Sequence, residues 1–368
     1  MRHEELLART DWSAVEHAHS GMPEVPRTPE ILAALLSDDA VRQARALGDL
    51  YGIIHHQDTI YSATAPAVDF VVAVLDAPRM LTPVAARGGV GTVPMRAALL
   101  DWLTSVMDAV AASGEAVSGE ATDIDACRAA RPRVFRAAWA MREDPDPAIV
   151  RAALGTLACV LDDGSELKRH RPEVAAWMGE HALARSDRCI RVLAVLTLTS
   201  WAYDTSPVLR DDPDAVVRAT AALSPAFAVK PEGTRALIDV LSNPADAAWC
   251  QQILPYFGRI YPFKLLPVAI DRATLEELVR ALGLLLAEPP DGTYVGDWGA
   301  RLRAKAFPGG FPPPQPLDAT QQALLDLVAM HCFGPAAPPR RFAADTRMAL
   351  RGLVPGGQVS QGAASAEW

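Results

Sequence analysis

Four histidines and an aspartate near the N-terminus form the first group of residues that could do chemistry. They are His17, His19, His55, His56 and Asp58. Imidazole and carboxylate groups are the usual protein ligands of zinc and other divalent metals. The alternative is that these side chains cap and bridge neighbouring helices. No HExxH motif accompanies them, so the sequence favours the bridging role and predicts no bound cofactor.

Two further patterns could be mistaken for catalytic or phosphate-binding motifs. The run RGGVGT at residues 87–92 is rich in glycine. A P-loop also needs a preceding strand and a Lys-Ser/Thr pair, which this run lacks, so a turn explains it equally well. His331 and Cys332 are adjacent, a spacing that separates them on a helix, and no GxSxG motif is present. The sequence therefore favours a protein without catalytic activity.

The segment 288–317 combines prolines with large aromatic side chains. Its seven prolines predict a loop that leaves the helical array. Aromatic and arginine side chains anchor many protein interfaces, so we expect a partner-binding surface here. The alternative is that the aromatic residues fold back and cap the apolar end of the array. The predicted contact residues are Tyr294, Trp298, Arg301, Arg303 and Phe311.

One local pattern recurs and predicts the elements that position these residues. An acid-rich turn precedes a β-branched residue, an arginine and an Ala/Leu-rich stretch, at 37–42, 144–151, 211–218 and, in degenerate form, 186–191. Asp or Ser at a helix N-cap accepts backbone N–H groups, and proline suits the first turn. The following apolar residues recur at i, i+3, i+4 and i+7. Each copy therefore predicts the start of an amphipathic helix.

The arginine of each copy carries a structural prediction. The β-branched residue beside it would enter the core, and the arginine would reach acids or carbonyls of an adjacent turn. Such contacts would form a ladder through the array. The predicted ladder residues are Arg42, Arg151, Arg191 and Arg218. The tryptophans of the Ala-rich stretches are expected to pack in the core or between repeats: Trp139, Trp177, Trp201 and Trp249.

The recurring pattern resembles the second helix of a HEAT repeat, whose signature is D-P-x-x-x-V-R-x-x-A. The resemblance covers most of residues 28–260 and implies an all-α, armadillo-like α-solenoid of stacked helical hairpins. Residues 11–19 and 54–64 are also similar to the opening of an actinobacterial group of HEAT-repeat proteins, with the motifs W-x-x-x-x-H-A-Y-G and H-Q-G-T-x-Y-x-A-T. In this chain His19-Ser20 replaces Tyr-Gly, and Asp58 replaces Gly. This second resemblance implies a bacterial protein with the same helical-repeat fold. It implies no particular reaction.

Composition indicates a folded protein from a reducing compartment. Half of the residues are hydrophobic and 21% are charged, so the chain can bury a large core. The net charge of -9 argues against broad binding to nucleic acid or membrane, although residues 301–368 are net basic.

Five widely spaced cysteines predict free thiols. The polar N-terminus lacks a signal peptide, and no run reaches the roughly 18 apolar residues of a membrane span. We expect a cytoplasmic protein.

The predicted organisation has four parts. They are a helical array over 1–287, the loop 288–317, a C-terminal helical cap over 318–355 and a flexible tail over 356–368. We expect a non-catalytic scaffold that holds a protein partner, with an inhibitor or immunity-type role as one version. The alternatives are a DNA-glycosylase-like HEAT protein that cradles duplex DNA, and a small-molecule lyase or tailoring enzyme with the 288–317 loop as a lid.

Overall fold

The computed structural model describes most of the chain and divides it into two compact units. Helices account for about 70% of it and strands for about 3%, which confirms the all-α prediction. The N-terminal unit comprises Met1–Thr197 with Leu254–Phe257, and the C-terminal unit comprises Leu198–Ile253 with Gly258–Trp368. The described residues are 3–86, 91–111, 119–161, 166–250, 253–254, 256–259, 265–287, 298–313, 315–333 and 344–353.

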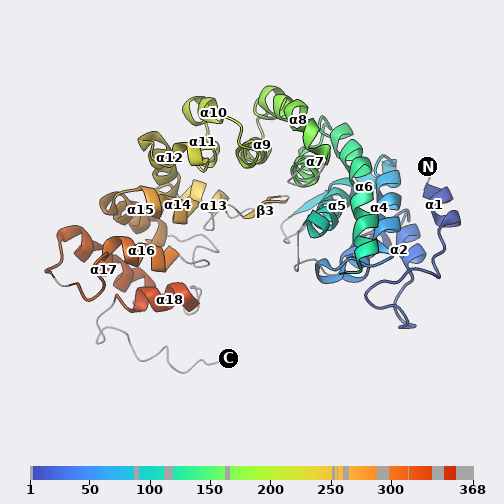
Figure 1. Cartoon of the computed structure of the whole chain (residues 1–368), viewed down its shortest axis with the longest axis horizontal. Helices are drawn as coiled ribbons and strands as arrows, with labels where there is room; N and C mark the ends of the chain where they lie inside the picture. Colours follow the sequence, from blue (N-terminus) through green and yellow to red (C-terminus); the bar gives the residue numbers. More distant parts are fainter. Residues whose placement is uncertain are drawn as a thin grey trace. The chain divides into compact units, whose positions relative to one another are not determined.

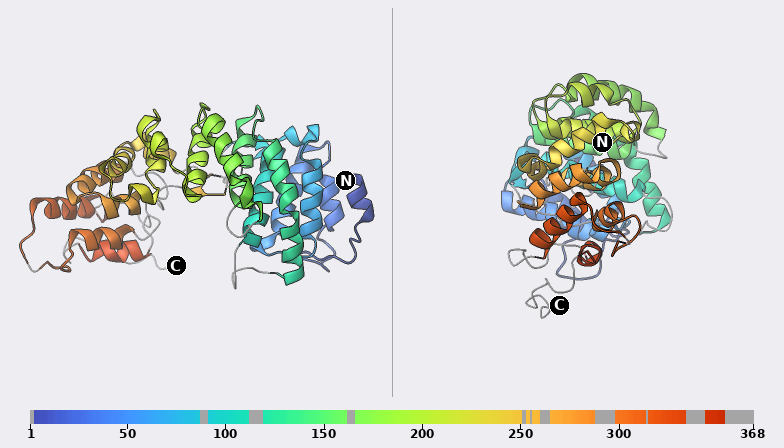
Figure 2. Two further views of the ribbon diagram at one scale, coloured as in Figure 1. Left: turned by 45° about the horizontal axis from the view of Figure 1, so that its top comes forward. Right: turned by 90° about the vertical axis from the view of Figure 1, so that its left-hand side faces the viewer.

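The N-terminal unit consists of helices packed in two rows. Its helices are α1 (His3–Arg9), α2 (Thr28–Ala34), α3 (Ala40–Asp49), α4 (Thr64–Val74), α5 (Met95–Ala111), α6 (Ala121–Ala140), α7 (Pro147–Val160), α8 (Arg171–Trp177) and the first part of α9 (Arg188–Ser200). In one row α4 packs against α6, and in the other α5 packs against α7 (Figure 1). Helix α6 also contacts both α5 and α7, which joins the rows. The left view of Figure 2 shows these helices side by side, coloured from blue to green.

Short elements connect the helices of this unit. The expected loop after α4 contains a short helical turn and an antiparallel hairpin in which Val84 pairs with Val93. The glycine-rich residues 87–90 lie outside the described part of the chain. The short elements are η1 (Leu50–Ile54), η2 (His56–Asp58), η3 (Pro78–Leu81), β1 (Pro83–Ala85), β2 (Thr92–Pro94), η4 (Glu166–His170) and η5 (Met178–Ala182).

The recurring acid-rich turns lie at helix N-termini. Asp39 and Asp146 are the N-caps of α3 and α7, and Asp214 is the N-cap of α11 (Ala215–Ala221). Their side chains accept backbone N–H groups at 2.9, 2.8 and 2.9 Å. In the degenerate copy, Asp187 accepts the N–H of Ile190 at 2.9 Å, at the start of α9. These bonds satisfy donors that have no partner inside the helix, so each copy begins a helix for a local chemical reason.

Helix α7 is the central core element of the N-terminal unit. Every residue from Ala152 to Val160 is buried, as expected for a helix that is apolar all round. The hydroxyl of Thr156 shares a hydrogen bond of 2.9 Å with that of Thr104 on α5. The buried polar groups at this helix contact are therefore satisfied.

The C-terminal unit repeats the two-row arrangement. Its elements are α10 (Ser206–Asp211), α11, η6 (Pro225–Phe227), α12 (Pro231–Leu241), α13 (Pro244–Trp249), α14 (Leu265–Arg272), α15 (Leu275–Ala287), α16 (Trp298–Ala306), α17 (Ala319–Cys332) and α18 (Ala344–Arg351). One row runs α12, α15, α17 and the other α14, α16, α18, each helix packing on the next. Two short strands, β3 (Ile253–Leu254) and β4 (Gly258–Arg259), precede α14. None of the described helices combines the length and hydropathy needed to cross a bilayer.

The expected loop at 288–317 contains a helix, which corrects the sequence prediction. Helix α16 occupies Trp298–Ala306. The prolines of the segment stand on either side of this stretch, at 289–290 and from 308 onward. The stretch between them, WGARLRAKA, is rich in helix-forming Ala, Arg, Lys and Leu. The positions of the prolines, more than their number, decide where the chain leaves the helical conformation.

Candidate functional site

The histidine cluster lies on two loops of the N-terminal unit that are hydrogen-bonded to each other. The backbone N–H of Glu16 donates to Ser62 Oγ at 2.8 Å. The N–H of Ala18 donates to the carbonyl of Ile53 at 3.1 Å. The loop with the first histidine pair is therefore fastened to the turn with the second pair.

His55 is the buried centre of this turn. Its side chain contacts the Thr59 carbonyl through Nδ1 at 3.2 Å, and its Nε2 lies 3.6 Å from Asp58 Oδ1. Gln57 and Asp58 have φ angles of 51° and 59°, in the left-handed region that favours Gly and tolerates Asp and Asn. The backbone thus explains why Asp fits this position, and Asp58 adds a contact to His55.

The remaining histidines connect the two loops. His17 is buried, and its Nδ1 accepts the N–H of His19 at 3.3 Å. Burial lowers the pKa of His17, and the neighbouring His19 lowers it further. The His19 ring packs edge-on against His56, with 5.3 Å between centroids. No three His, Cys, Asp or Glu side chains converge as a metal site within the described residues, and the observed contacts are those of a bridge between loops.

The four ladder arginines occupy different environments. Arg151 donates to Asp187 at 2.8 Å, across to the turn before α9, as the pattern predicts. Arg218 donates to the carbonyl of Asp212 at 2.8 Å, in the turn before its own helix. Arg191 is half-buried on α9. Arg42 is exposed, and the described residues offer it no ion pair.

The register of α3 explains why Arg42 differs. The neighbouring Val41 is 78% exposed, whereas the corresponding Val150 and Val217 are fully buried. The expected burial of the β-branched residue therefore fails in this copy. Val41 is the second residue after its N-cap, whereas Val150 and Val217 are the fourth and third residues after theirs. Because each residue turns about 100° around the helix axis, the same Val-Arg pair faces a different direction in each copy.

Other arginines, which the sequence pattern did not single out, join the turns to helix ends. Arg96 donates through Nε to the carbonyl of Leu75, at the end of α4, at 2.7 Å, and its Nη1 lies 3.3 Å from Asp144. Arg79 similarly lies 3.2 Å from Asp38. The same donation to a carbonyl at the end of a helix is made by Arg128 to Val110 at 3.0 Å, Arg171 to Leu161 at 2.7 Å and Arg272 to Ala222 at 2.6 Å.

This use of arginine has a chemical reason that the composition already signals. The last carbonyls of a helix lack partners and carry negative partial charge. A guanidinium donates in several directions at once, so Arg96 serves a carbonyl and a carboxylate together, which a lysine ammonium does less well. The chain has 31 Arg and 4 Lys. The strong excess of arginine was the available sequence signal for these contacts.

The described part of segment 288–317 folds into the C-terminal unit. Trp298 is 1% exposed and Phe307 is 4% exposed. Phe311 packs edge-on against Phe307, with 4.9 Å between ring centroids. Trp298 is therefore a core residue and not the exposed partner contact that the sequence predicted. Arg301 pairs with Asp271 at 2.9 Å on the surface.

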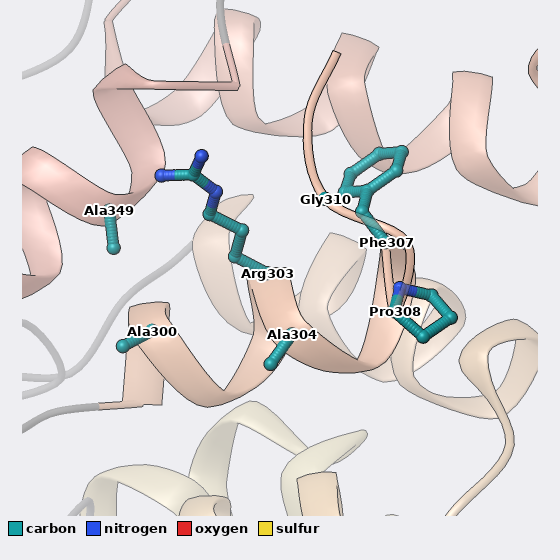
Figure 3. A pocket seen from close by; sticks show the side chains of 7 residues that line it. All are labelled: Ala300, Arg303, Ala304, Phe307, Pro308, Gly310 and Ala349. Atoms are coloured by element: carbon teal, nitrogen blue, oxygen red, sulfur yellow. The ribbon is translucent and has the colours of Figure 1, made fainter. Parts of the chain in front are cut away.

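Arg303 is the predicted contact residue that borders a cavity. The cavity has a volume of about 350 Å³ and lies beside α16 and α18 (Figure 3). Arg303 is half-buried, and the described residues provide no acid or carbonyl within hydrogen-bond distance of its guanidinium. Tyr294, the last residue predicted for this surface, lies outside the described residues.

Two tryptophans of the N-terminal unit, Trp139 and Trp177, belong to an aromatic cluster between α6 and α8. Trp139 is half-buried and meets Trp177 edge-on, with 6.0 Å between ring centroids. The guanidinium of Arg142 lies 3.9 Å above the Trp139 ring. Phe135 stacks on His170 at 4.8 Å. These contacts pack both rings between neighbouring helices and leave Trp139 partly exposed.

The cysteine thiols are expected to have low reactivity. All five are buried and none is in a disulfide. Burial raises the pKa of Cys127 and Cys332 to about 12, and that of Cys189 to about 11. Because the thiolate is the reactive form, these groups are poor nucleophiles at neutral pH.

No protein-family model matches this sequence, and the curated proteins include no match. The assignment of function therefore depends on the geometry of the chain itself.

Proposed function

We propose that the chain is a non-catalytic helical-repeat protein, an α-solenoid of HEAT-like hairpins that holds a protein partner. The main support is the repeated junction between helix pairs. Arg96 meets Asp144 before α7, and Arg151 meets Asp187 before α9. A capped acid turn held by an arginine fixes each pair against the next. A stiff stack of helix pairs presents an extended surface, which is how repeat proteins bind other proteins.

The Trp139 face is the surface we assign to the partner. We define it as the exposed or half-buried residues Arg136, Trp139, Arg142 and His181. The buried Trp177 packs against Trp139 and supports this face. Tryptophan and arginine are enriched among the residues that dominate binding energy at interfaces. The stacking contacts hold the rings in place, so binding would order few additional side chains.

The charge of the Trp139 face indicates the chemistry of the partner. Arg136 is exposed one turn before Trp139, and it makes no ion pair or hydrogen bond with the described residues. An unneutralised arginine beside an aromatic ring favours an acidic partner with an apolar contact residue. An inhibitor or immunity-type role is one form of this proposal.

Affinity capture with matched surface variants tests the proposal. The tagged full-length chain would be incubated with lysate of cells that naturally express it, and bound proteins quantified by mass spectrometry. We expect one partner to bind the wild type and to rebind it when both are purified. Arg136→Glu combined with Trp139→Ala should reduce that binding at least tenfold.

Arg42→Glu is the matched control, because Arg42 is also exposed and makes no ion pair with the described residues. It makes the same charge change away from the Trp139 face and should leave binding unchanged. Equal loss in both variants would show attraction to net charge alone. Failure of any protein to rebind in purified form would contradict the scaffold role.

A further inference from the structure

The cavity beside α16 forms a second candidate site, separate in sequence from the Trp139 face. Its volume of about 350 Å³ falls at the lower end of the range for small-molecule pockets. Figure 3 shows Arg303 reaching from α16 toward the α18 turn that carries Ala349, while Phe307 and Pro308 stand on the other side. The lining residues are Ala300, Arg303, Ala304, Phe307, Pro308, Gly310 and Ala349.

The lining combines one cation with an otherwise apolar wall. Arg303 is the only charged residue among those that line the cavity. It is half-buried, yet no acid or carbonyl of the described residues accepts a hydrogen bond from it. This distinguishes it from Arg301 on the same helix, which is paired with Asp271. A partly desolvated guanidinium to which the described residues offer no acceptor favours an anionic ligand.

The guanidinium of Arg303 lies beside the end of α18. A Cβ added at Gly352 would lie 2.9 Å from Nη1 of Arg303. The guanidinium therefore lies against the last turn of α18, where the helix dipole favours a cation. The planar fork of an arginine matches the two oxygens of a carboxylate.

We infer that this cavity binds a small molecule carrying one carboxylate on an apolar, ring-sized body. The single cation sets the charge of the ligand, because a phosphate dianion would need more donors than the lining provides. The alanine methyl groups and the Phe307 ring offer apolar contact, and aromatic rings pack favourably edge to face. Charge and shape thus select a compact aromatic or alicyclic monocarboxylate.

Ligand-observed NMR with simple probes tests this inference on the full chain. Benzoate is the probe, benzamide its neutral counterpart, and inorganic phosphate an anion without an apolar body. We expect benzoate to bind at least tenfold more tightly than benzamide and to resist displacement by equimolar phosphate. Displacement by phosphate at equal affinity would show a general anion site and overturn the inference.

Three variants test whether the probes bind in the cavity beside α16. Arg303→Gln should remove the preference for benzoate over benzamide. Ala304→Leu should weaken both probes, because its larger side chain fills the cavity while the charge remains. Arg301→Gln is the matched control on the same helix and should bind like the wild type. Circular dichroism would verify that each variant is folded.

The outcomes separate this inference from the proposed partner function. If Arg303→Gln binds benzoate as the wild type does, the carboxylate site is wrong. If Arg301→Gln and Arg303→Gln weaken binding equally, the effect is surface charge and the inference also fails. Neither result bears on capture at the Trp139 face, which involves no residue of α16.

Discussion

At the scale of single residues, His17 depends on a neutral ring. Its Nδ1 accepts the N–H of His19, so a proton on that atom would remove the bond. Burial lowers the pKa of His17 in the folded chain below its ordinary value, which is about 6.5 for an exposed histidine. The unfolded chain then binds more protons at mildly acidic pH. The free energy of unfolding should therefore fall as the pH drops below about 6.5.

We expect His17→Gln to show a flatter dependence of stability on pH between about 7 and 5, since glutamine does not titrate. Urea unfolding at several pH values measures this difference. Asp11 and Glu30 have lowered pKa values because hydrogen bonds stabilise their charged forms, so their contribution is lost only at lower pH. Identical slopes for the variant and the wild type in the mildly acidic range would contradict the assignment to His17.

Ala202 is a second residue whose conformation has a testable consequence. It follows α9 with φ at 61°, in the region where a Cβ is unfavourable. The N–H of Tyr203 donates to the Leu198 carbonyl at 2.9 Å, which closes a helix-ending motif that usually has glycine. We expect Ala202→Gly to raise the free energy of unfolding by about 0.5–1 kcal/mol.

Ala44 provides the opposite control for this substitution. It is exposed inside α3, where Ala44→Gly should lower stability by about 1 kcal/mol. Urea unfolding of both variants measures whether each substitution raises or lowers the free energy of unfolding. A loss of stability in Ala202→Gly would show that the surrounding contacts, and not the backbone conformation, determine the preference at this position.

At the scale of elements, the sequence predicts where helices begin more reliably than which side chains meet. N-capping by Asp39, Asp146 and Asp214 is a local interaction, so the pattern identified the starts of α3, α7 and α11. Contacts between turns depend on the rotation of each helix. Arg42 points to solvent while Arg79 and Arg96 reach the acid turns, and no local pattern distinguishes these cases.

The contact between Arg151 and Asp187 should contribute measurably to stability. Both side chains are partly buried, at 33% and 22% exposed. Arg151→Ala would leave the Asp187 carboxylate without its partner and should lower the free energy of unfolding by about 1–2 kcal/mol. Arg42→Ala, at a solvated site, should change it by less than about 0.5 kcal/mol.

A double-mutant cycle with Asp187→Asn isolates the pair, because asparagine retains N-capping ability and loses the charge. Urea unfolding midpoints of the four proteins supply the coupling energy. Equal stability of Arg151→Ala and the wild type would show that the ion pair is merely a solvated contact.

At the scale of the whole molecule, helical periodicity was sufficient to predict the all-α fold class. It was insufficient to predict that the chain divides into two compact units. The acid turns before α7 and before α11 have similar sequences, yet they lie in different compact units. Such a division depends on contacts between residues far apart in sequence. The sequence did not predict the cavity beside α16 either, because Ala300, Ala304 and Ala349 resemble any alanine of an amphipathic helix.

The buried thiols allow the stability of the two units to be compared in one chain. Cys127 lies on α6 in the N-terminal unit, and Cys332 lies on α17 in the C-terminal unit. Burial raises the pKa of both to about 12. Only about 10⁻⁴ of each thiol would be ionised at pH 8, so alkylation of the folded chain should be roughly 10³-fold slower than that of a free cysteine.

Pulsed alkylation across a urea series should separate the two units, using variants that retain only Cys127 or only Cys332. Each thiol becomes reactive when its own unit opens. We expect Cys332 to react at lower urea, because α17 ends its row of packed helices among the described elements and has fewer helical neighbours than α6. Coincident midpoints would show that both units unfold as one cooperative structure. Fast alkylation of either thiol without urea would instead contradict its burial, since a thiol that is open to reagent has no reason to keep a raised pKa.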